Sequence, residues 1–353
     1  MMARTDRHCR YFLRQITART LLYSEMVTAD AVVHGDRTRL LAFDEAEHPL
    51  GLQLGGAEPD ALARAAEIGQ AFGYDEINLN IGCPSPRVRA GRFGAALMET
   101  PDLVADCARA MIRAVGVPVT VKCRIGIDGR GAYEDLRSFV ETVAAAGVRS
   151  FAVHARIAVL DGLSPAENRE VPPLRYDAVY RLKQELPALE VVINGGVRSL
   201  DEADAHLDRV DGAMIGRAAY ADPAMLRGVD RRFFGAQAGP LPSRHDVARA
   251  MLPYVRDKCA DGVPLHCIAR HMLGLFAGRP GGRAWRRALG GTSHRPGAGA
   301  EVIEEALTLV PEPERTPADA PPYRAGGRAT GRERSSLPPA PARESPSIGP
   351  PAR

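Results

Sequence analysis

The chain has 353 residues, of which 45% are hydrophobic and 25% are charged, and its net charge is +3. This composition predicts a globular protein with one large core or two moderate ones. The six cysteines include no C-x-x-C pair, so neither a disulfide framework nor a metal site is expected. No run of 18 apolar residues and no apolar leader occurs, so we expect no membrane span and a cytoplasmic location.

The first two thirds of the chain alternate short apolar runs with amphipathic stretches, a pattern typical of a parallel sheet wrapped by helices. Strands are predicted at 21–26, 50–54, 75–80, 117–122, 150–154, 190–194 and 212–215. Helices are predicted near 5–17, 58–72, 101–114, 132–146, 176–185, 199–207 and 222–232. A (β/α)8 barrel needs eight strands, so we expect an α/β TIM-type barrel over residues 1–234 that lacks its first strand.

The composition changes twice in the C-terminal part. Residues 235–242 are rich in glycine and proline and are predicted to form a linker. Residues 243–310 have helical apolar spacing and carry ten Lys/Arg against six Asp/Glu, which predicts a small, basic, all-helical domain. The charge alone does not separate an RNA-binding surface from an ordinary solvated one. Residues 311–353 are rich in Pro, Ala and Arg with few aliphatic side chains, so a disordered tail is expected.

The strand predicted at 75–80 runs into a turn that carries a thiol. Ile77, Leu79 and Ile81 alternate with polar residues, which predicts a half-buried strand. The glycine and proline on either side of Cys83 end the strand and constrain this side chain. In a parallel barrel such positions meet at one mouth, where the catalytic groups lie. The alternative interpretation of Cys83 is a small buried core residue.

Polar residues follow every predicted strand. They are Glu25, Gln53, Asn80 with Cys83, Lys122 with Arg124, His154 with Arg156, Asn194 with Gly195 and Gly196, and Gly216 with Arg217. Glycines after the last two strands lie where barrels often bind phosphate, and a nearby arginine adds a charge-assisted contact. The lysine, histidine and glutamine can bind the polar edge of a flat heterocycle, although a rim lysine and a core histidine are the structural alternatives. This set predicts FMN rather than a dinucleotide, because no G-x-G-x-x-G follows a strand.

Longer motifs make the chain resemble the tRNA-dihydrouridine synthases, and within them the A subfamily, over residues 1 to about 310. The motifs are TDRHCRYF at 5–12, SEMV at 24–27, EHP at 47–49 before QLGG at 53–56, NLNIGCPS at 78–85, GLSP at 162–165, NR at 168–169 and NGG at 194–196. The resemblance implies an FMN enzyme that reduces the C5–C6 double bond of uridine in the D-loop of tRNA, with NADPH as reductant. The A subfamily is associated with positions 20 and 20a.

The same resemblance assigns roles to residues. Hydride would pass from flavin N5 to C6 of an extruded uracil, and Cys83 would give the proton to C5. FMN would be held by Met1, Met2, Gln53, Lys122, His154, Asn194, Gly195, Gly196, Gly216 and Arg217. The tRNA would be contacted by Asn80, Arg169, Arg283 and Arg286, the last two from the helical domain. A monomer without a protein partner is expected.

The chain departs from the family pattern in three ways. Family members begin with a strand ending in Ala-Pro-Met-Met, of which only Met1 and Met2 are present here, and Ala3 stands where aspartate is common. Ile157 and Ala166 stand where the family usually has lysine, so two RNA-facing charges are expected to be missing. Either the start of the gene has been set too late or the protein is truncated.

Two other hypotheses remain open from the sequence. One is an FMN oxidoreductase that acts on a free pyrimidine and does not need the helical domain. The other is a non-catalytic tRNA-binding relic whose barrel no longer holds FMN. The cluster of arginines at 283, 286 and 287 disfavours the first, and the colour of the purified protein separates the second from an enzyme.

Overall fold

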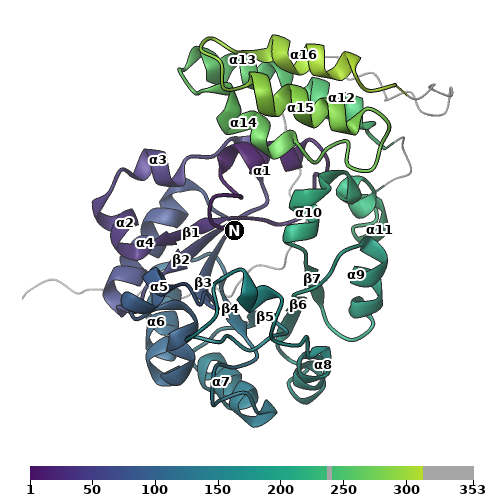
Figure 1. Cartoon of the computed structure of the whole chain (residues 1–353). Coiled ribbons are helices and arrows are strands. Elements are labelled where there is room, and N and C mark those ends of the chain that lie inside the picture. Colours follow the sequence, from purple (N-terminus) through teal and green to yellow (C-terminus); the bar gives the residue numbers. More distant parts are fainter. Residues whose placement is uncertain (237–240, 313–353) are drawn as a thin grey trace, which may run out of the picture.

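The computed structural model describes residues 1–236 and 241–312. Its larger part is an incomplete α/β barrel, in which helices surround a curved parallel sheet (Figure 1). Each strand pairs in parallel with the next one along the chain. The strands are β1 (Leu22–Thr28), β2 (Leu50–Gly55), β3 (Glu76–Ile81), β4 (Val119–Arg124), β5 (Ser150–His154), β6 (Glu190–Asn194) and β7 (Gly212–Met214). The seven predicted strands are confirmed to within two residues at each end. Among the described residues, β7 does not pair with β1, so the sheet is open between them.

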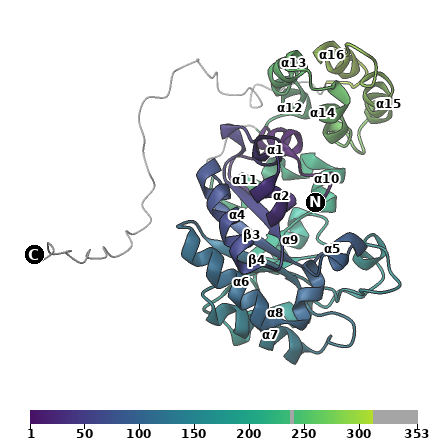
Figure 2. The same ribbon diagram turned by 90° about the vertical axis from the view of Figure 1, so that its left-hand side faces the viewer.

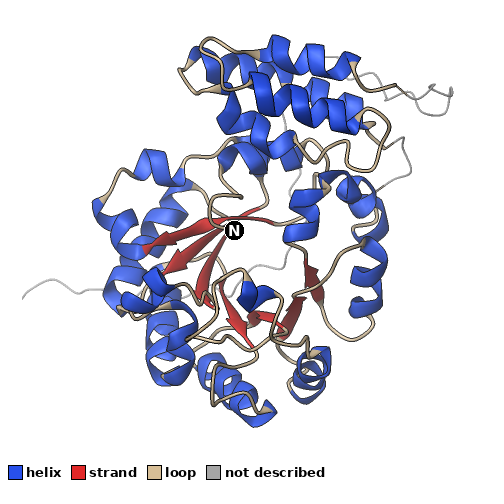
Figure 3. Ribbon diagram, in the orientation of Figure 1, coloured by secondary structure: helices blue, strands red, loops and turns tan. Residues whose placement is uncertain are grey.

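Helices form a layer outside the sheet (Figure 3). They are α1 (Arg7–Arg14), α2 (Ala29–His34), α3 (Arg37–Leu41), α4 (Pro59–Phe72), α5 (Pro86–Ala90), α6 (Pro101–Ala114), α7 (Tyr133–Ala145), α8 (Tyr176–Glu185), α9 (Leu200–Leu207), α10 (Arg217–Ala221) and α11 (Val229–Phe233). Proline at the first position and a left-handed glycine after the last explain the bounds of α4. The long helices agree with the sequence prediction.

The shorter helices differ from the prediction. A single helix at 222–232 is wrong, because a 3-10 segment (Pro223–Gly228) precedes α11 and the separate helix α10 comes before both. No helix is predicted at α5, which has five residues, or at α2 and α3, which are six and five residues long. Thr28 and Asp36 cap their N-termini through side-chain oxygens. Helices this short contain too few turns for an apolar period to show.

The polar residues of β3 face the barrel interior rather than solvent. Asn78 is 1% exposed and Asn80 is 8% exposed, while the three apolar residues of the strand are wholly buried. The prediction of a half-buried strand is therefore wrong. In a barrel wrapped by helices both faces of a strand are covered, so an alternating pattern here marks a polar interior.

A second unit of helices packs beside the barrel, against α1 and α10 (Figures 1 and 2). It consists of α12 (Arg244–Ala250), α13 (Leu252–Ala260), α14 (Leu265–Met272), α15 (Gly282–Thr292) and α16 (Ala300–Thr308). Trp285 is buried at its centre and donates from Nε1 to the carbonyl of Met272 (3.0 Å). Phe12 of α1 and Ile16, which follows this helix, belong to the same apolar core. Residues 237–240 of the expected linker and 313–353 of the expected tail lie outside the described residues.

Asp6 ties the first helix of the barrel to this helical unit. Its side chain accepts from the N–H of Cys9 (3.0 Å), which caps α1, and pairs with Arg270 and with His271 (3.0 Å). Burial raises the pKa of Asp6, but the hydrogen bond and charge of His271 and the contact with Arg270 outweigh it, so the net pKa lies below its ordinary value. Asp6 is therefore ionised at neutral pH.

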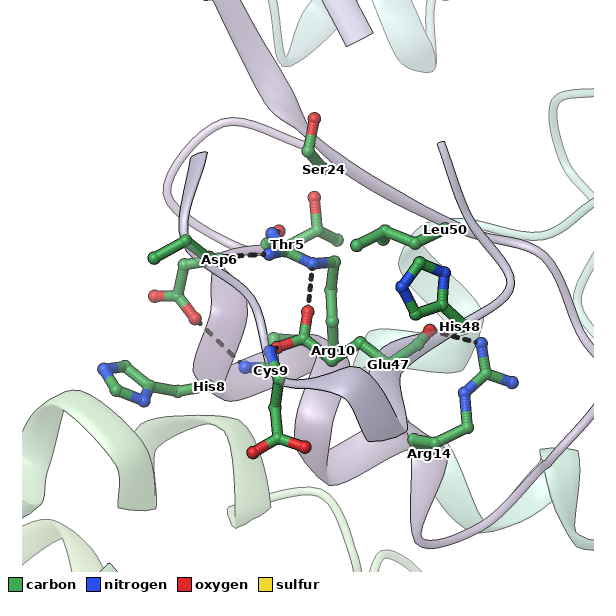
Figure 4. Close-up of polar contacts among 12 residues, drawn as sticks. Thr5, Asp6, His8, Cys9, Arg10, Arg14, Ser24, Glu47, His48 and Leu50 are labelled. Atoms are coloured by element: carbon green, nitrogen blue, oxygen red, sulfur yellow. Dashed lines mark hydrogen bonds and ion pairs between the residues drawn. The ribbon is translucent and has the colours of Figure 1, made fainter. Parts of the chain in front are cut away.

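A buried ion pair anchors α1 to the loop before β2 (Figure 4). Arg10 Nε donates to Glu47 Oε2 (2.7 Å), with side-chain exposures of 5% and 0%. Arg10 also donates to the carbonyl of Thr5 (3.0 Å), and Glu47 accepts from the N–H of Asp44 (2.8 Å). Arg14 donates to the carbonyls of Thr17, Thr20, Glu47 and Pro49.

Within residues 1–236 and 241–312, none of the helices combines the length and hydropathy needed to cross a bilayer.

Candidate active site

Asn80, at the end of β3, shapes the turn that carries Cys83. Its Oδ1 accepts from the backbone N–H groups of Gly82 (3.1 Å) and Cys83 (3.0 Å), and its Nδ2 donates to Gln53 Oε1 (2.8 Å). The carbonyl of Cys83 accepts from the N–H of Ala95 (3.0 Å). The thiol is half-buried, and its Sγ has no hydrogen-bond partner in the part of the chain that the structure describes. The turn is fixed, while the sulfur is free to meet a ligand.

Lys122 and His154 lie on neighbouring strands and have polar groups without protein partners. Neither the ammonium nor the imidazole makes a hydrogen bond among the described residues. Burial lowers the pKa of Lys122 to about 8, and the charge of Arg124 adds to this effect. Burial also lowers the pKa of His154, with further contributions from Arg124 and Lys122, so its imidazole is neutral at pH 7. A ligand with acceptor atoms and negative charge would satisfy these groups.

Glycines after β6 make room for the His154 ring and the Tyr176 hydroxyl. Gly195 and Gly196 have φ values of +105° and +76°, which favour glycine. A Cβ on Gly195 would overlap the His154 ring, and one on Gly196 would lie 2.6 Å from Tyr176 Oη. Asn194 donates from Nδ2 to the carbonyl of Met214 (2.7 Å), which links the ends of β6 and β7.

The structure brings the Met1 side chain to this mouth, and Met2 is the more exposed of the two. A Cβ on Gly216, directly after β7, would lie 3.4 Å from Met1 Sδ. Figure 1 places the N-terminus over the opening of the ring of strands. The Met2 side chain, by contrast, is 60% exposed.

Three arginines hold the loop that presents Arg169. Arg124 donates to the carbonyls of Asn168 (2.9 Å) and Gly82 (3.2 Å), so it also braces the Cys83 turn. Arg217 donates to the carbonyl of Arg169 (3.1 Å) and pairs with the exposed carboxylate of Glu170 (2.8 Å). The third arginine, at position 156, donates to the carbonyls of residues 170 and 172. The guanidinium of Arg169 has no partner among the described residues.

Burial and the charge of Arg217 lower the pKa of two neighbouring arginines. The pKa of Arg156 is lowered by burial and then by the charge of Arg217. The same two causes lower the pKa of Arg169. The mouth thus combines the unpartnered polar groups of Lys122, His154 and Arg169 with the two glycines of positive φ. This combination fits a planar, phosphorylated ligand.

The remaining predicted RNA residues lie on the helical unit. Arg283 and Arg286 are exposed on α15 and, with Arg287, form no ion pair within the described residues. Other arginines of this unit are paired, for example Arg256 with Glu304 (2.5 Å). Figure 2 places α15 on the side of the molecule toward which the N-terminus and α5 also lie.

Sequence reasoning placed Arg124 and Arg156 at strand ends but gave them no role, and it gave none to Asn78 or Thr120. The structure assigns the two arginines to holding the loop after β5. Their position directly after a strand was the available signal. For Asn78 the signal is its alternation with Ile77 and Leu79, which predicted a half-buried strand; no such pattern was used for Thr120.

Comparison with known proteins gives one consistent result. The sequence model of the dihydrouridine synthase (Dus) family matches residues 1–310. The tRNA-dihydrouridine(20/20a) synthase of Xanthomonas campestris is 56% identical over 306 residues, which are 87% of this chain and 90% of that protein. The synthase of the same name from Synechocystis is 54% identical over 307 residues, 87% of this chain and 92% of that protein.

Among solved structures, morphinone reductase superposes with a TM-score of 0.46 at 12% identity, over 69% of this chain and 84% of that chain, a similarity too weak to carry an argument. The family match over nearly all of the described residues is decisive instead. The chain belongs to the dihydrouridine synthase family.

Proposed function

We propose that this protein reduces uridine to 5,6-dihydrouridine in the D-loop of tRNA, at positions 20 and 20a, with FMN as cofactor and NADPH as reductant. The name shared by relatives more than 50% identical supports the substrate and the positions. The observation that carries the chemistry is the unpartnered Cys83 thiol, held in a fixed turn at the same mouth as the unpartnered groups of Lys122 and His154. The enzyme would act as a monomer in the cytoplasm.

Cys83 is the proposed general acid. A thiol can act as a general acid, so Cys83 can give a proton to C5 of the uracil. A flavin bound at the mouth would supply hydride to C6. Asn80 keeps the sulfur in place through the two N–H groups of the turn, and Arg124 does so through the carbonyl of Gly82. Because Asn80 uses both ends of its amide within the protein, its contribution to RNA binding would act through this turn.

The cofactor would be held by groups from five strand ends. Lys122, His154 and the remaining N–H and lone pair of the Gln53 amide would contact the ring edge, since Asn78 and Asn80 use its other donor and acceptor sites. Gly216 and Arg217 would bind the phosphate together with the 194–196 turn. Met1 would contribute from above Gly216, and Met2 would act through its backbone. The open edge between β1 and β7 is where the eighth strand of a closed (β/α)8 barrel would lie. We place the barrel at residues 1–234 and the helical domain at residues 243–310.

Flavin affinity is expected to fall as the pH rises through 8. Binding next to Lys122 favours its charged form, so the complex holds the proton that the free protein loses near pH 8. The affinity for FMN is therefore highest below pH 8, and the Kd for FMN should be about tenfold higher at pH 9.5 than at pH 7. Fluorescence titration of FMN in the Cys83→Ala background measures this without interference from the thiol. Lys122→Met should bind weakly with a flat profile, and parallel profiles for the two proteins would refute the assignment.

Removing charge from α15 is expected to weaken tRNA binding and its salt dependence. Arg283→Gln with Arg286→Gln should raise the Kd for tRNA about tenfold at moderate salt and reduce the slope of log K against log salt by about two. Arg256→Gln is the matched control, because this arginine is exposed on the same unit but paired with Glu304. Filter binding at several salt concentrations gives both quantities. Equal effects of the double and control variants would exclude a specific RNA contact at α15.

The proposed function is tested with purified protein, FMN, NADPH and unmodified tRNA. NADPH should bleach the flavin under anaerobic conditions, and mass spectrometry should then find dihydrouridine at positions 20 and 20a. Product on free uracil or uridine but not on tRNA would support a small-molecule oxidoreductase. A protein that binds tRNA but neither holds flavin nor forms product would be a non-catalytic relic.

A further inference from the structure

A continuous row of hydrogen bonds runs through the barrel interior from the Cys83 turn to Glu76. Asn80 Nδ2 donates to Gln53 Oε1 (2.8 Å), and Gln53 Nε2 donates to Asn78 Oδ1 (2.9 Å). Asn78 Nδ2 then donates to Thr120 Oγ1 (2.8 Å), and Thr120 donates to Glu76 Oε1 (2.5 Å). We call these four links the interior relay.

The register of the sheet explains why the relay forms. Gln53 of β2, Asn78 of β3 and Thr120 of β4 are neighbours in one row across three strands. Side chains two residues apart on one strand share a face, so Glu76, Asn78 and Asn80 all point inward. The members between the ends are 1% to 8% exposed, so water cannot replace a lost partner.

Both ends of the relay fix the direction of every link. At the mouth, Gly82 and Cys83 offer only N–H donors, so Asn80 must present Oδ1 to them and Nδ2 to Gln53. At the other end, the carboxylate of Glu76 accepts, so Thr120 must donate. Each amide in between therefore has one permitted orientation. If one amide turned over, two donors or two acceptors would face each other at the next link.

Glu76 is itself held by a second donor. Tyr23 Oη donates to the same Oε1 atom (2.7 Å). Tyr23, Gly51 and Glu76 occupy one row across β1, β2 and β3. A Cβ on Gly51 would lie 2.8 Å from the Tyr23 ring, so the glycine lets the ring cross β2 to reach the carboxylate. This contact stabilises the end of the relay without being one of its links.

We propose that Asn78 and Thr120 are positioning residues, which act through the interior relay to fix the orientation of the Gln53 amide and of the Cys83 turn at the barrel mouth. This proposal rests on the flavin site proposed above. Loss of the Thr120 hydroxyl would leave one donor without a partner in the row. All links donate in the same direction along the row. The amides of Asn78, Gln53 and Asn80 can therefore turn over one after another, and each turn moves the mismatched pair of donors one link closer to the mouth. The mismatch ends at the N–H groups of the Cys83 turn, which cannot reverse. A change far from the ligand therefore alters the groups that meet it.

The test compares three variants of the full chain. Thr120→Val removes the hydroxyl with little change of shape and cuts the relay, Thr120→Ser keeps it, and Tyr23→Phe removes a hydrogen bond to Glu76 without cutting it. Thr120→Val should raise the Kd for FMN about tenfold, because a buried unpaired donor destabilises the arrangement that binds. It should also alter the absorbance of bound flavin and lower kcat about tenfold at nearly unchanged KM for tRNA. Thr120→Ser and Tyr23→Phe should stay within about twofold of the unmodified protein in all these quantities.

The outcomes separate positioning from stability and from the reaction itself. A lower Tm for Thr120→Val with unchanged flavin affinity, spectrum and kcat would overturn the proposal, as would equal effects of Thr120→Val and Tyr23→Phe. If Thr120→Val does not fold, Thr120→Ala measured against Thr120→Ser gives the same comparison. Failure of Cys83→Ala to affect turnover would refute the proposed acid, but the flavin-affinity comparison would still decide whether the relay acts on Gln53.

Discussion

Replacing Cys83 by alanine is expected to lower the rate of dihydrouridine formation by a factor of about 10² to 10⁴, the range that a positioned proton donor contributes. The sulfur has no hydrogen-bond partner among the described residues, so its removal breaks no hydrogen bond of the folded protein. Flavin affinity, and the rate at which NADPH reduces the flavin, should remain within about twofold of the unmodified enzyme. Single-turnover reaction of the reduced enzyme with tRNA, followed by mass spectrometry, isolates the affected step.

Cys259 provides the matched control. It is also a half-buried free cysteine, but it lies on α13 of the helical unit. Cys259→Ala should leave the single-turnover rate unchanged within about twofold. Normal product formation by Cys83→Ala would mean that the proton comes from water or from another side chain.

Replacing Arg10 by methionine is expected to destabilise the protein by about 3–5 kcal/mol, because it leaves the carboxylate of Glu47 buried without its charged partner. Glu47 is fully buried, and the only other hydrogen bond to its carboxylate among the described residues comes from the N–H of Asp44. Burial already raises the pKa of Glu47 against the opposing charge of Arg10. Urea unfolding followed by circular dichroism measures the loss.

Two further variants distinguish a buried ion pair from an ordinary one. Arg64 pairs with Glu67 at a similar distance (2.8 Å) on the exposed face of α4, so Arg64→Met should change stability by no more than about 1 kcal/mol. The double variant Arg10→Met, Glu47→Leu should recover most of the loss, because no buried charge remains. A double variant as unstable as the single one would show that packing, rather than charge, is what Arg10 supplies.

The sequence predicted the strand ladder well because local information sufficed for it. Six of the seven strands, β2 to β7, have glycine, proline or a charged residue next to at least one end, and consecutive strands are neighbours in the sheet. The mouth followed from the same rule, since Cys83, Lys122 and His154 each lie within two residues of the end of a strand. Positions that depend only on strand ends can be read from one sequence.

Contacts between distant segments could not be predicted in this way. The alternation at Asn78 and Asn80 has two meanings, solvent or barrel interior, and only the closed layer of helices decides between them. The pairing of Arg10 with Glu47 joins residues 37 positions apart through a loop of irregular backbone. Likewise, nothing local in the sequence indicates that Arg124 and Arg217 hold the loop of Arg169 by its carbonyls.

The packing of α1 has a consequence for the order in which this chain can fold during synthesis. Phe12 and Ile16, near the start, share an apolar core with Trp285 and Ile303, near the end of the described chain. The strand ladder can grow in order as each segment leaves the ribosome, because every strand pairs with its predecessor. The first helix made, however, receives its packing partner almost last. Nascent chains shorter than about 310 residues thus expose the apolar face of α1, which makes them targets for chaperones until the helical unit emerges.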